Sequence, residues 1–138
     1  CENAEKVLNF LKKHKEVTKV IYSTEHDKHI ADRAKKYLKG GNGPMIGIEL
    51  KGGIEAGKRF IESLKMFYHV ANIGDARSLA IHPASTTHSQ LNEEELAAAG
   101  VTQSYIRLCI GLEHIDDIID DLEQALNKSS KGTLKAVS

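Results

Sequence analysis

The chain has 138 residues, of which 41% are hydrophobic and 28% are charged. This length and composition are typical of one globular domain with a modest core. Nineteen basic residues balance nineteen acidic ones, so no overall field attracts nucleic acid or an anionic membrane. Tryptophan is absent and only 5% of the residues are aromatic, which disfavours recognition of stacked bases.

Targeting signals are not visible in the sequence. No apolar run approaches the roughly 20 residues that span a bilayer, and the first residues are polar rather than signal-peptide-like. The two cysteines, Cys1 and Cys109, form no disulfide framework, so we expect a reducing, cytoplasmic setting. A start at Cys1 without methionine is consistent with a processed product or an excised fragment.

The hydrophobic periodicity predicts a mixture of helices and strands. Asn92 is expected to cap one short helix, which Gly100 would close, and the polar tail 127–138 is expected to be loose. Helices are predicted at 2–14, 29–38, 54–64, 93–99 and 115–126, and strands at 17–22, 45–50, 66–71, 79–81 and 105–110.

These elements favour an α+β two-layer domain. No internal repeat or linker divides the chain, so one domain is expected. Some connections are long enough for helical crossovers, whereas the link between 71 and 79 is short and suggests neighbouring strands. The predicted architecture is a small, mainly antiparallel sheet with helices on one face. The other face would be open, and an open sheet face usually meets a ligand or a partner domain.

The stretch 105–114 reads as a strand, a tight turn at Gly111 and the start of a helix. Ile106, Leu108 and Ile110 alternate with residues that point the other way, and Arg107 is among these. A permanent charge in mid-strand is costly unless it has a partner or a wet cleft. A guanidinium held there is suited to bidentate binding of a carboxylate or phosphate, and the competing interpretation is a structural ion pair with a nearby Asp or Glu.

Two loops rich in hydrogen-bonding side chains, 72–78 and 82–88, flank the strand at 79–81. One interpretation is an anion site in which Asn72 and Thr87 supply neutral donors beside Arg107. The alternative is turn chemistry, with Asp75 and Ser85 satisfying backbone groups.

Two other kinds of chemistry have weaker support. His82, His88, Cys109 and His114 contain metal-ligating atoms, but their spacing matches no structural zinc motif, so no metal is expected. Ser85 or Cys109 with His88 could form a nucleophile and base pair, but no nucleophile elbow is present.

Several motifs make a specific family resemblance. They are NIGDARSLAIHPASTTH at 72–88, YIRLCIGLE at 105–113, MIGIELKGG at 45–53 and Glu2-Asn-Ala near the start. Together they closely resemble the C-terminal domain of the Cys/Met-metabolism enzymes that depend on pyridoxal 5'-phosphate, over residues 1–127. The run at 72–78 is most similar to the O-acetylhomoserine sulfhydrylase branch. Cystathionine γ-synthases, γ-lyases and methionine γ-lyases are the alternatives within the family.

The resemblance implies roles for three residues. Arg107 matches the arginine that binds the substrate α-carboxylate. Asn72 stands where many members have a serine near that carboxylate, and Thr87 matches a threonine that helps to orient the arginine. His82 and His88 are expected to serve packing and loop shape.

The same resemblance implies that the cofactor chemistry lies elsewhere. The family binds its cofactor through a lysine of a large domain in a Ser-x-Thr-Lys-like context, and no lysine here has that context. We therefore expect residues 1–127 to be the small C-terminal domain and 128–138 a flexible tail. We expect no catalytic or cofactor-binding residue in this chain, whose partners would be the large domain of the same polypeptide and an amino-acid substrate.

The resemblance further implies a parent homotetramer that makes homocysteine from O-acetylhomoserine and sulfide. The isolated 138 residues are expected to be inactive. A rival hypothesis is a free-standing domain that binds a small anion or a partner without catalysis. The reading frame upstream of Cys1 discriminates between the two, because only the enzyme requires a cofactor lysine there.

Overall fold

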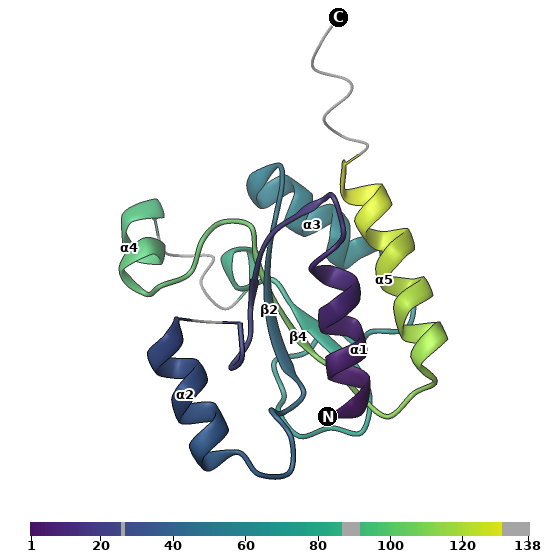
Figure 1. Ribbon diagram of the computed structural model, residues 1–138. Helices are drawn as coiled ribbons and strands as arrows, with labels where there is room; N and C mark the ends of the chain where they lie inside the picture. The colour runs from purple at the N-terminus through teal and green to yellow at the C-terminus, as the bar shows by residue number, and fades with distance from the viewer. Residues whose placement is uncertain (26, 87–91, 131–138) are drawn as a thin grey trace, which may run out of the picture.

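The computed structural model describes residues 1–25, 27–86 and 92–130 (Figure 1). Five α-helices, four strands and one 3-10 helix lie within these residues. In chain order they are α1 (Glu2–Leu11), β1 (Val17–Ile21), α2 (Lys28–Tyr37), β2 (Met45–Leu50), α3 (Gly53–Ser63), β3 (Leu79–Ile81), η1 (Pro83–Ser85), α4 (Glu93–Ala98), β4 (Tyr105–Cys109) and α5 (Ile115–Ser130).

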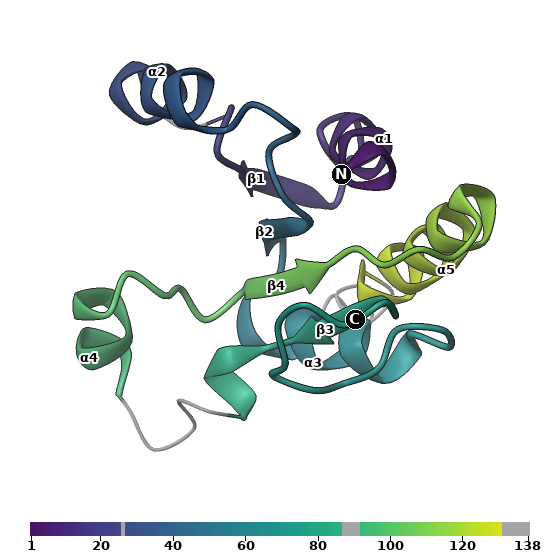
Figure 2. The same ribbon diagram turned by 90° about the horizontal axis from the view of Figure 1, so that it is seen from below.

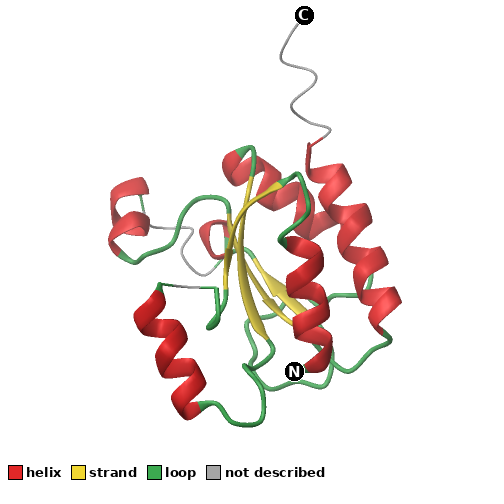
Figure 3. Ribbon diagram, viewed as in Figure 1, coloured by secondary structure: helices red, strands yellow, loops and turns green. Residues whose placement is uncertain are grey.

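The four strands, which are yellow in Figure 3, form one sheet. Their order is β1-β2-β4-β3, and each neighbouring pair is antiparallel. Strand β2 is almost entirely apolar, as suits a central strand that is covered by neighbours on both edges. Its predicted bounds, 45–50, are those of the structure.

Helices α1, α3 and α5 cover one face of the sheet and form the hydrophobic core with it (Figure 2). Each helix contributes an apolar stripe, such as Val7 and Leu11 of α1 or Ile118 and Leu122 of α5. Phe60 of α3 is completely buried against this layer. The expected α+β two-layer architecture is confirmed.

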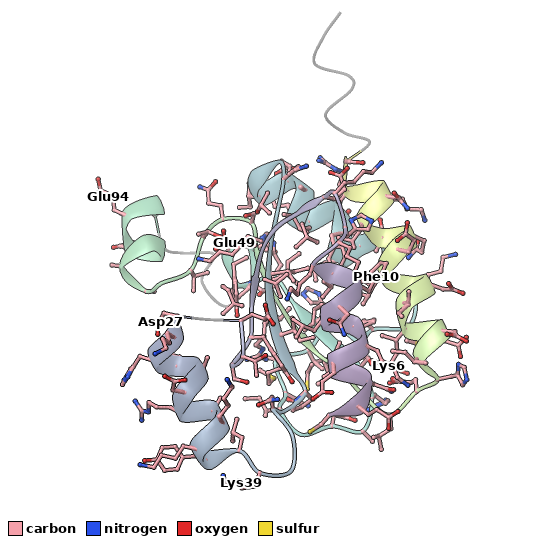
Figure 4. All side chains as sticks on the ribbon, viewed as in Figure 1. Lys6, Phe10, Asp27, Lys39, Glu49 and Glu94 are labelled. Carbon is pink, nitrogen blue, oxygen red and sulfur yellow. The ribbon has the colours of Figure 1, made fainter. Side chains whose placement is uncertain are left out.

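Helices α2 and α4 lie on the opposite side of the sheet (Figure 2). Figure 4 labels Asp27 and Lys39 near the two ends of α2 and Glu94 on α4, away from Lys6 and Phe10 of α1. Ala34 is the one residue of α2 that is buried. The sheet face on this side is therefore less covered than the face that carries the core.

Two helix starts follow the capping chemistry of their sequences. Asp27 accepts a hydrogen bond from the Ile30 amide at 3.0 Å. Asn92 and Glu95 form a reciprocal capping box, in which each side chain accepts from the other residue's amide at 2.9 Å. Gly100, with a φ of +72°, follows α4. The predicted cap and stop of this helix are confirmed.

The strand predicted at 66–71 is wrong. Within this segment Tyr68 alone forms a ladder contact, an isolated parallel bridge to Leu79. The amides of Met66 and Phe67, which a strand would use for pairing, donate instead to the buried carboxylate of Asp121 at 2.8 and 3.3 Å. The segment still runs beside β3, because the Tyr68 carbonyl accepts from the Ala80 amide at 2.9 Å.

Two helix ends also differ from their predicted positions. Helix α1 stops at Leu11 rather than residue 14, and the chain turns there through a hydrogen bond from the His14 amide to the Leu11 carbonyl. Helix α5 continues to Ser130, so residues 127–130 of the expected loose tail are helical. Arg59 stabilises this extension, because its Nε donates to the Ser129 carbonyl at 3.0 Å. Residues 131–138 lie outside the described part of the chain.

Among the described residues, no helix combines the length and the apolar character that crossing a membrane requires.

Candidate functional site

The site develops on the sheet face that α1, α3 and α5 leave uncovered. The strand register places Ile21, Gly47, Arg107 and Ile81 in one row across β1, β2, β4 and β3. The alternation of β4 turns Ile106 and Leu108 into the core and Arg107 away from it. The predicted orientation of Arg107 is therefore the one that the structure has.

Arg107 is half-buried, and its guanidinium has one hydrogen-bond partner among the described residues. Its Nη2 donates to the main-chain carbonyl of Ala71 at 2.9 Å. Within the residues that the structure describes, Arg107 makes no ion pair with an aspartate or glutamate. The structural ion pair considered from the sequence is therefore not found among these residues, to which the guanidinium donates one hydrogen bond.

Asn72 follows directly on the peptide unit that binds Arg107. The contact with the Ala71 carbonyl brings the start of the 72–78 loop beside the guanidinium. Asn72 itself is exposed. The structure thus brings together two of the three residues that the family resemblance singles out, through a backbone contact that the sequence does not reveal.

The rest of this loop is shaped by turn chemistry. The Asp75 carboxylate accepts from the Arg77 amide at 2.9 Å and lies 3.5 Å from Arg77 Nε. These contacts lower the pKa of Asp75, with the backbone hydrogen bond from Arg77 as the largest cause. The Arg77 guanidinium also stacks 4.4 Å above the Tyr68 ring. The interpretation of Asp75 as a turn residue is supported.

The second loop is built around His82, which is fully buried. Its Nε2 lies 2.7 Å from the Gln103 carbonyl and its Nδ1 lies 2.9 Å from Ser85 Oγ. Since a carbonyl only accepts, Nε2 carries the proton and Nδ1 of the neutral ring accepts from Ser85. Burial lowers the pKa of His82, and the charges of Lys58 and His69 act in the same direction. His82 therefore ties the loop to the residues that lead into β4.

Thr87 and His88 lie outside the described residues. The described part of the loop ends at Thr86, whose hydroxyl donates to the His82 carbonyl at 2.9 Å. The loop begins directly after Ile81, the last residue of β3, and Ile81 lies opposite Arg107 in the register. The predicted contribution of Thr87 stays a prediction.

The metal and nucleophile alternatives both include His88, which lies outside the described residues. Among the described residues, no three His, Cys, Asp or Glu side chains gather closely enough to hold a metal ion. Both ring nitrogens of His82 are occupied, Cys109 is buried in β4, and His114 lies 3.7 Å from Asp116 at the start of α5.

Sequence reasoning missed three residues that shape the site: Gly47, Tyr105 and Ala71. Together with Arg107, Gly47 and Tyr105 border a cavity of about 250 Å³ whose other walls are Ile21, Tyr22, Ser23, Met45 and Ile46. A glycine inside an otherwise apolar strand is the signal that could have found this arrangement, because it often marks a close approach. Ala71 acts through its backbone, so no side-chain signal exists for it.

The described residues do not fit the attachment site of an aldehyde cofactor. Such a site needs a lysine whose charge is suppressed by burial or by neighbouring cations. Every lysine within the described ranges is exposed except Lys58, which is half-buried and forms an ion pair with Glu55 at 2.9 Å.

Comparison with known proteins identifies the family. Residues 1–127 match the family model of the Cys/Met metabolism PLP-dependent enzymes, and the chain belongs to this family. Among curated relatives, the O-acetyl-L-homoserine sulfhydrylase of Leptospira meyeri is 52% identical over 125 residues, which are 90% of this chain and 28% of that protein. The L-methionine gamma-lyase of Fusobacterium nucleatum subsp. polymorphum is 47% identical over 130 residues, or 93% of this chain and 32% of that protein.

Solved structures agree with this membership. An O-acetylhomoserine (thiol)-lyase from Campylobacter jejuni, which carries a pyridoxyl-lysine phosphate, matches 91% of this chain with a TM-score of 0.81 and 46% identity. A cystathionine gamma synthase from Xanthomonas oryzae in complex with cystathionine matches 94% with a TM-score of 0.80 and 32% identity. This chain covers 30% and 33% of those two chains. It therefore spans about a third of the length of the relatives that it matches.

Proposed function

We propose that residues 1–127 form the small C-terminal domain of a PLP-dependent O-acetylhomoserine sulfhydrylase, and that the domain binds the substrate α-carboxylate through Arg107. One observation carries the proposal. Arg107 is a half-buried residue on the less covered sheet face, and among the described residues its guanidinium has a backbone carbonyl as its partner rather than a carboxylate. A buried or half-buried arginine without an acidic partner is well suited to receive an anionic ligand.

The Ala71 contact fixes the direction of the guanidinium. One Nη2 proton is donated to the carbonyl, and the remaining N–H groups of the planar fork can donate to both oxygens of a carboxylate. Such charge-assisted hydrogen bonds contribute about 1.5–3 kcal/mol each. Their role in the reaction is to hold the amino-acid substrate in one orientation, so that its labile bonds face the reactive centre.

Asn72 and Thr87 are proposed as neutral donors beside the same carboxylate. Asn72 is exposed and is the residue directly after Ala71, whose carbonyl binds Arg107 Nη2. Its backbone therefore begins beside the guanidinium. For Thr87 the support is the family motif alone.

The cofactor of the family is pyridoxal 5'-phosphate, which supplies the electron sink for amino-acid chemistry. In the proposed protein a large domain outside these 138 residues holds it. The isolated chain is then expected to bind the cofactor weakly and to turn over no substrate. A stable absorbance band on titrating the isolated chain with pyridoxal phosphate, surviving gel filtration, would contradict this assignment.

The sulfhydrylase branch is favoured over its relatives by similarity. The matched sulfhydrylase of Thermus thermophilus is 58% identical over 95 residues. Similarity to a methionine gamma-lyase and to a cystathionine gamma synthase keeps those two activities as the runner-up candidates. The parent is further proposed to be a cytoplasmic homotetramer, which light scattering of the full-length protein would test.

The deciding experiment is a homocysteine assay with O-acetylhomoserine and sulfide on the full-length protein that carries this chain. Wild type is compared with Arg107→Ala and with Arg33→Ala, which removes an exposed arginine of α2. We expect Arg107→Ala to lower kcat/KM by about 100-fold or more, which corresponds to losing two charge-assisted hydrogen bonds. Arg33→Ala should have little effect.

Each other outcome has a definite meaning. Elimination products or cystathionine in place of homocysteine would retain the family and change the branch. Normal kinetics for Arg107→Ala would refute the carboxylate role. Circular dichroism and thermal unfolding of Arg107→Ala should match wild type closely, because the change removes a single exposed backbone contact from the fold.

A further inference from the structure

We propose that Tyr105 is a positioning residue for Arg107: its ring, seated on Gly47, closes one side of the guanidinium and directs the arginine toward Ala71. This inference rests on the proposed function, because the positioned group is the proposed carboxylate receptor. It concerns a contact between neighbouring strands that neither the motifs nor the comparisons assign.

The ring occupies the space that a side chain at residue 47 would fill. A Cβ added to Gly47 would lie 2.7 Å from Tyr105 Cε2, 2.9 Å from Oη and 3.1 Å from Cζ. Separations below 3.0 Å are not tolerated by real Cβ atoms. Tyr105 is paired with Glu49 in the register, so its ring leans along β2 by two residues to lie over Gly47.

Gly47 is the residue directly opposite Arg107 on β2. Because glycine has no side chain, this position leaves space into which the long Arg107 side chain could extend across β2. The Tyr105 ring occupies the space directly over Gly47, and it therefore limits how far the arginine side chain can turn toward β2. On the β3 side, the Ala71 carbonyl receives Nη2 at 2.9 Å. The ring thus lies over the β2 residue opposite Arg107, while the carbonyl binds the guanidinium itself.

The energetic benefit of this arrangement is preorganisation. A free arginine loses up to about 2 kcal/mol of side-chain conformational entropy when a ligand orders it. An arginine that is already confined pays less of that cost on binding, and its affinity for a carboxylate rises accordingly. The contribution comes from the bulk of the ring, because the structure records no hydrogen bond to the Tyr105 hydroxyl within the described residues.

The tyrosine also leaves the positive charge uncompensated. Burial raises the pKa of Tyr105 from its ordinary value of 10.0, an effect that Arg107 opposes and Glu49 reinforces. The phenol is therefore neutral at physiological pH and does not neutralise the guanidinium as a carboxylate would. An acidic residue at this position would fill the same space and would compete with the ligand.

The test measures carboxylate recognition directly. In the full-length protein, inhibition constants are determined for L-norleucine and for L-norleucinamide, which differ in the charge of the carboxyl group. The ratio of the amide constant to the acid constant reports the preference for the carboxylate. The variants are Tyr105→Phe, Tyr105→Leu, Tyr105→Ala and the double variant Gly47→Val with Tyr105→Ala, with Arg107→Ala as reference.

We expect Tyr105→Ala to lower the ratio about three- to tenfold, the equivalent of one side chain that is no longer held in place. Tyr105→Leu should give a smaller loss in the same direction, and it replaces Tyr105→Ala if that variant does not fold. Tyr105→Phe should leave the ratio within about twofold, since it keeps the ring. The double variant should regain most of the ratio, because valine at residue 47 fills the emptied space.

Two failures are distinguishable. If Arg107→Ala leaves the ratio unchanged, the carboxylate site itself is wrong and the proposed function fails. If Arg107→Ala abolishes the preference but Tyr105→Ala and Tyr105→Leu retain it, the carboxylate site stands and the positioning role of Tyr105 is overturned. A loss in Tyr105→Ala that valine at residue 47 does not restore would also overturn the space-filling explanation.

Discussion

The carboxylate of Glu113 binds Ser78 through both of its oxygens. Oε1 accepts from the Ser78 amide at 2.7 Å and Oε2 accepts from its hydroxyl at 2.8 Å. The same hydroxyl oxygen accepts from the Gly111 amide at 2.9 Å, so the end of the 72–78 loop is fixed to the turn after β4. Ser78 is fully buried. The contact between Glu113 and Ser78 therefore fixes the end of the 72–78 loop relative to β4, the strand that carries Arg107.

Breaking this pair should destabilise the fold. Glu113→Gln retains the shape of the side chain but replaces one acceptor oxygen by an NH₂ group that faces a donor. We expect the free energy of unfolding to fall by about 1–3 kcal/mol, as for a lost charge-assisted hydrogen bond with a buried donor left unpaired. Urea denaturation measures the change. In a double-mutant cycle with Ser78→Ala, additive losses would show that the two residues are not coupled.

Asp121 should be more important for stability than its neighbour on α5. Its buried carboxylate accepts from the amides of Lys65, Met66 and Phe67. Asp121→Asn turns an NH₂ group toward some of these amides, and we expect a loss of about 2–3 kcal/mol in the free energy of unfolding. Asp120→Asn, at an exposed position of the same helix, is the matched control and should stay within about 0.5 kcal/mol of wild type. Equal effects at the two positions would contradict this explanation.

The stability of the fold should fall in mild acid because of His82. Burial lowers the pKa of His82 in the folded state, whereas in the unfolded chain the imidazole titrates near its ordinary value of 6.5. Above pH 6.5 both states are neutral and the stability contribution is complete. As the pH falls from 6.5 through the lowered folded pKa, the unfolded state binds more protons and this contribution is lost.

Thermal unfolding between pH 5 and 8 checks this prediction. The slope of stability against pH should correspond to at most about one extra proton bound by the unfolded chain. His82→Gln should reduce the slope, while His114→Gln, at an exposed position, should retain it. If His82→Gln keeps the wild-type slope of stability against pH, groups other than His82 cause the loss of stability in mild acid.

Adding even a methyl group at Gly57 should destabilise the protein. Alanine is ordinarily favoured over glycine inside a helix by about 1 kcal/mol. At Gly57 of α3, however, a Cβ would lie 2.5 Å from His82 Nε2 and 2.7 Å from Cε1, so the ring would have to move from its hydrogen bonds. We expect Gly57→Ala to destabilise the protein by about 1–3 kcal/mol.

Gly40→Ala is the control for this substitution, because a Cβ there meets nothing within 4 Å. It should change the midpoint of thermal unfolding little. A stabilised Gly57→Ala variant would show that the His82 ring can shift without loss, which would also weaken the pH prediction.

Much of the secondary structure was determined by local sequence. The apolar run of β2, the reciprocal cap between Asn92 and Glu95, and the alternation that turns Arg107 away from the core are all properties of neighbouring residues, and the structure has each of them. Periodicity and capping act over a few residues, so they are readable without the fold. The family motifs added the roles proposed for Arg107, Asn72 and Thr87.

Tertiary structure decided the features that depend on residues far apart in the chain. The segment at 66–71 has the composition of a strand, but Asp121, more than 50 residues away, takes the amides that a strand would have used. The Ala71 carbonyl reaches Arg107 across 36 residues, and Tyr105 lies on Gly47 of another strand. Each contact follows from strand register and backbone direction, which no local pattern encodes. The sequence by itself therefore determined the elements and the arginine, whereas the three-dimensional packing decided what surrounds that arginine.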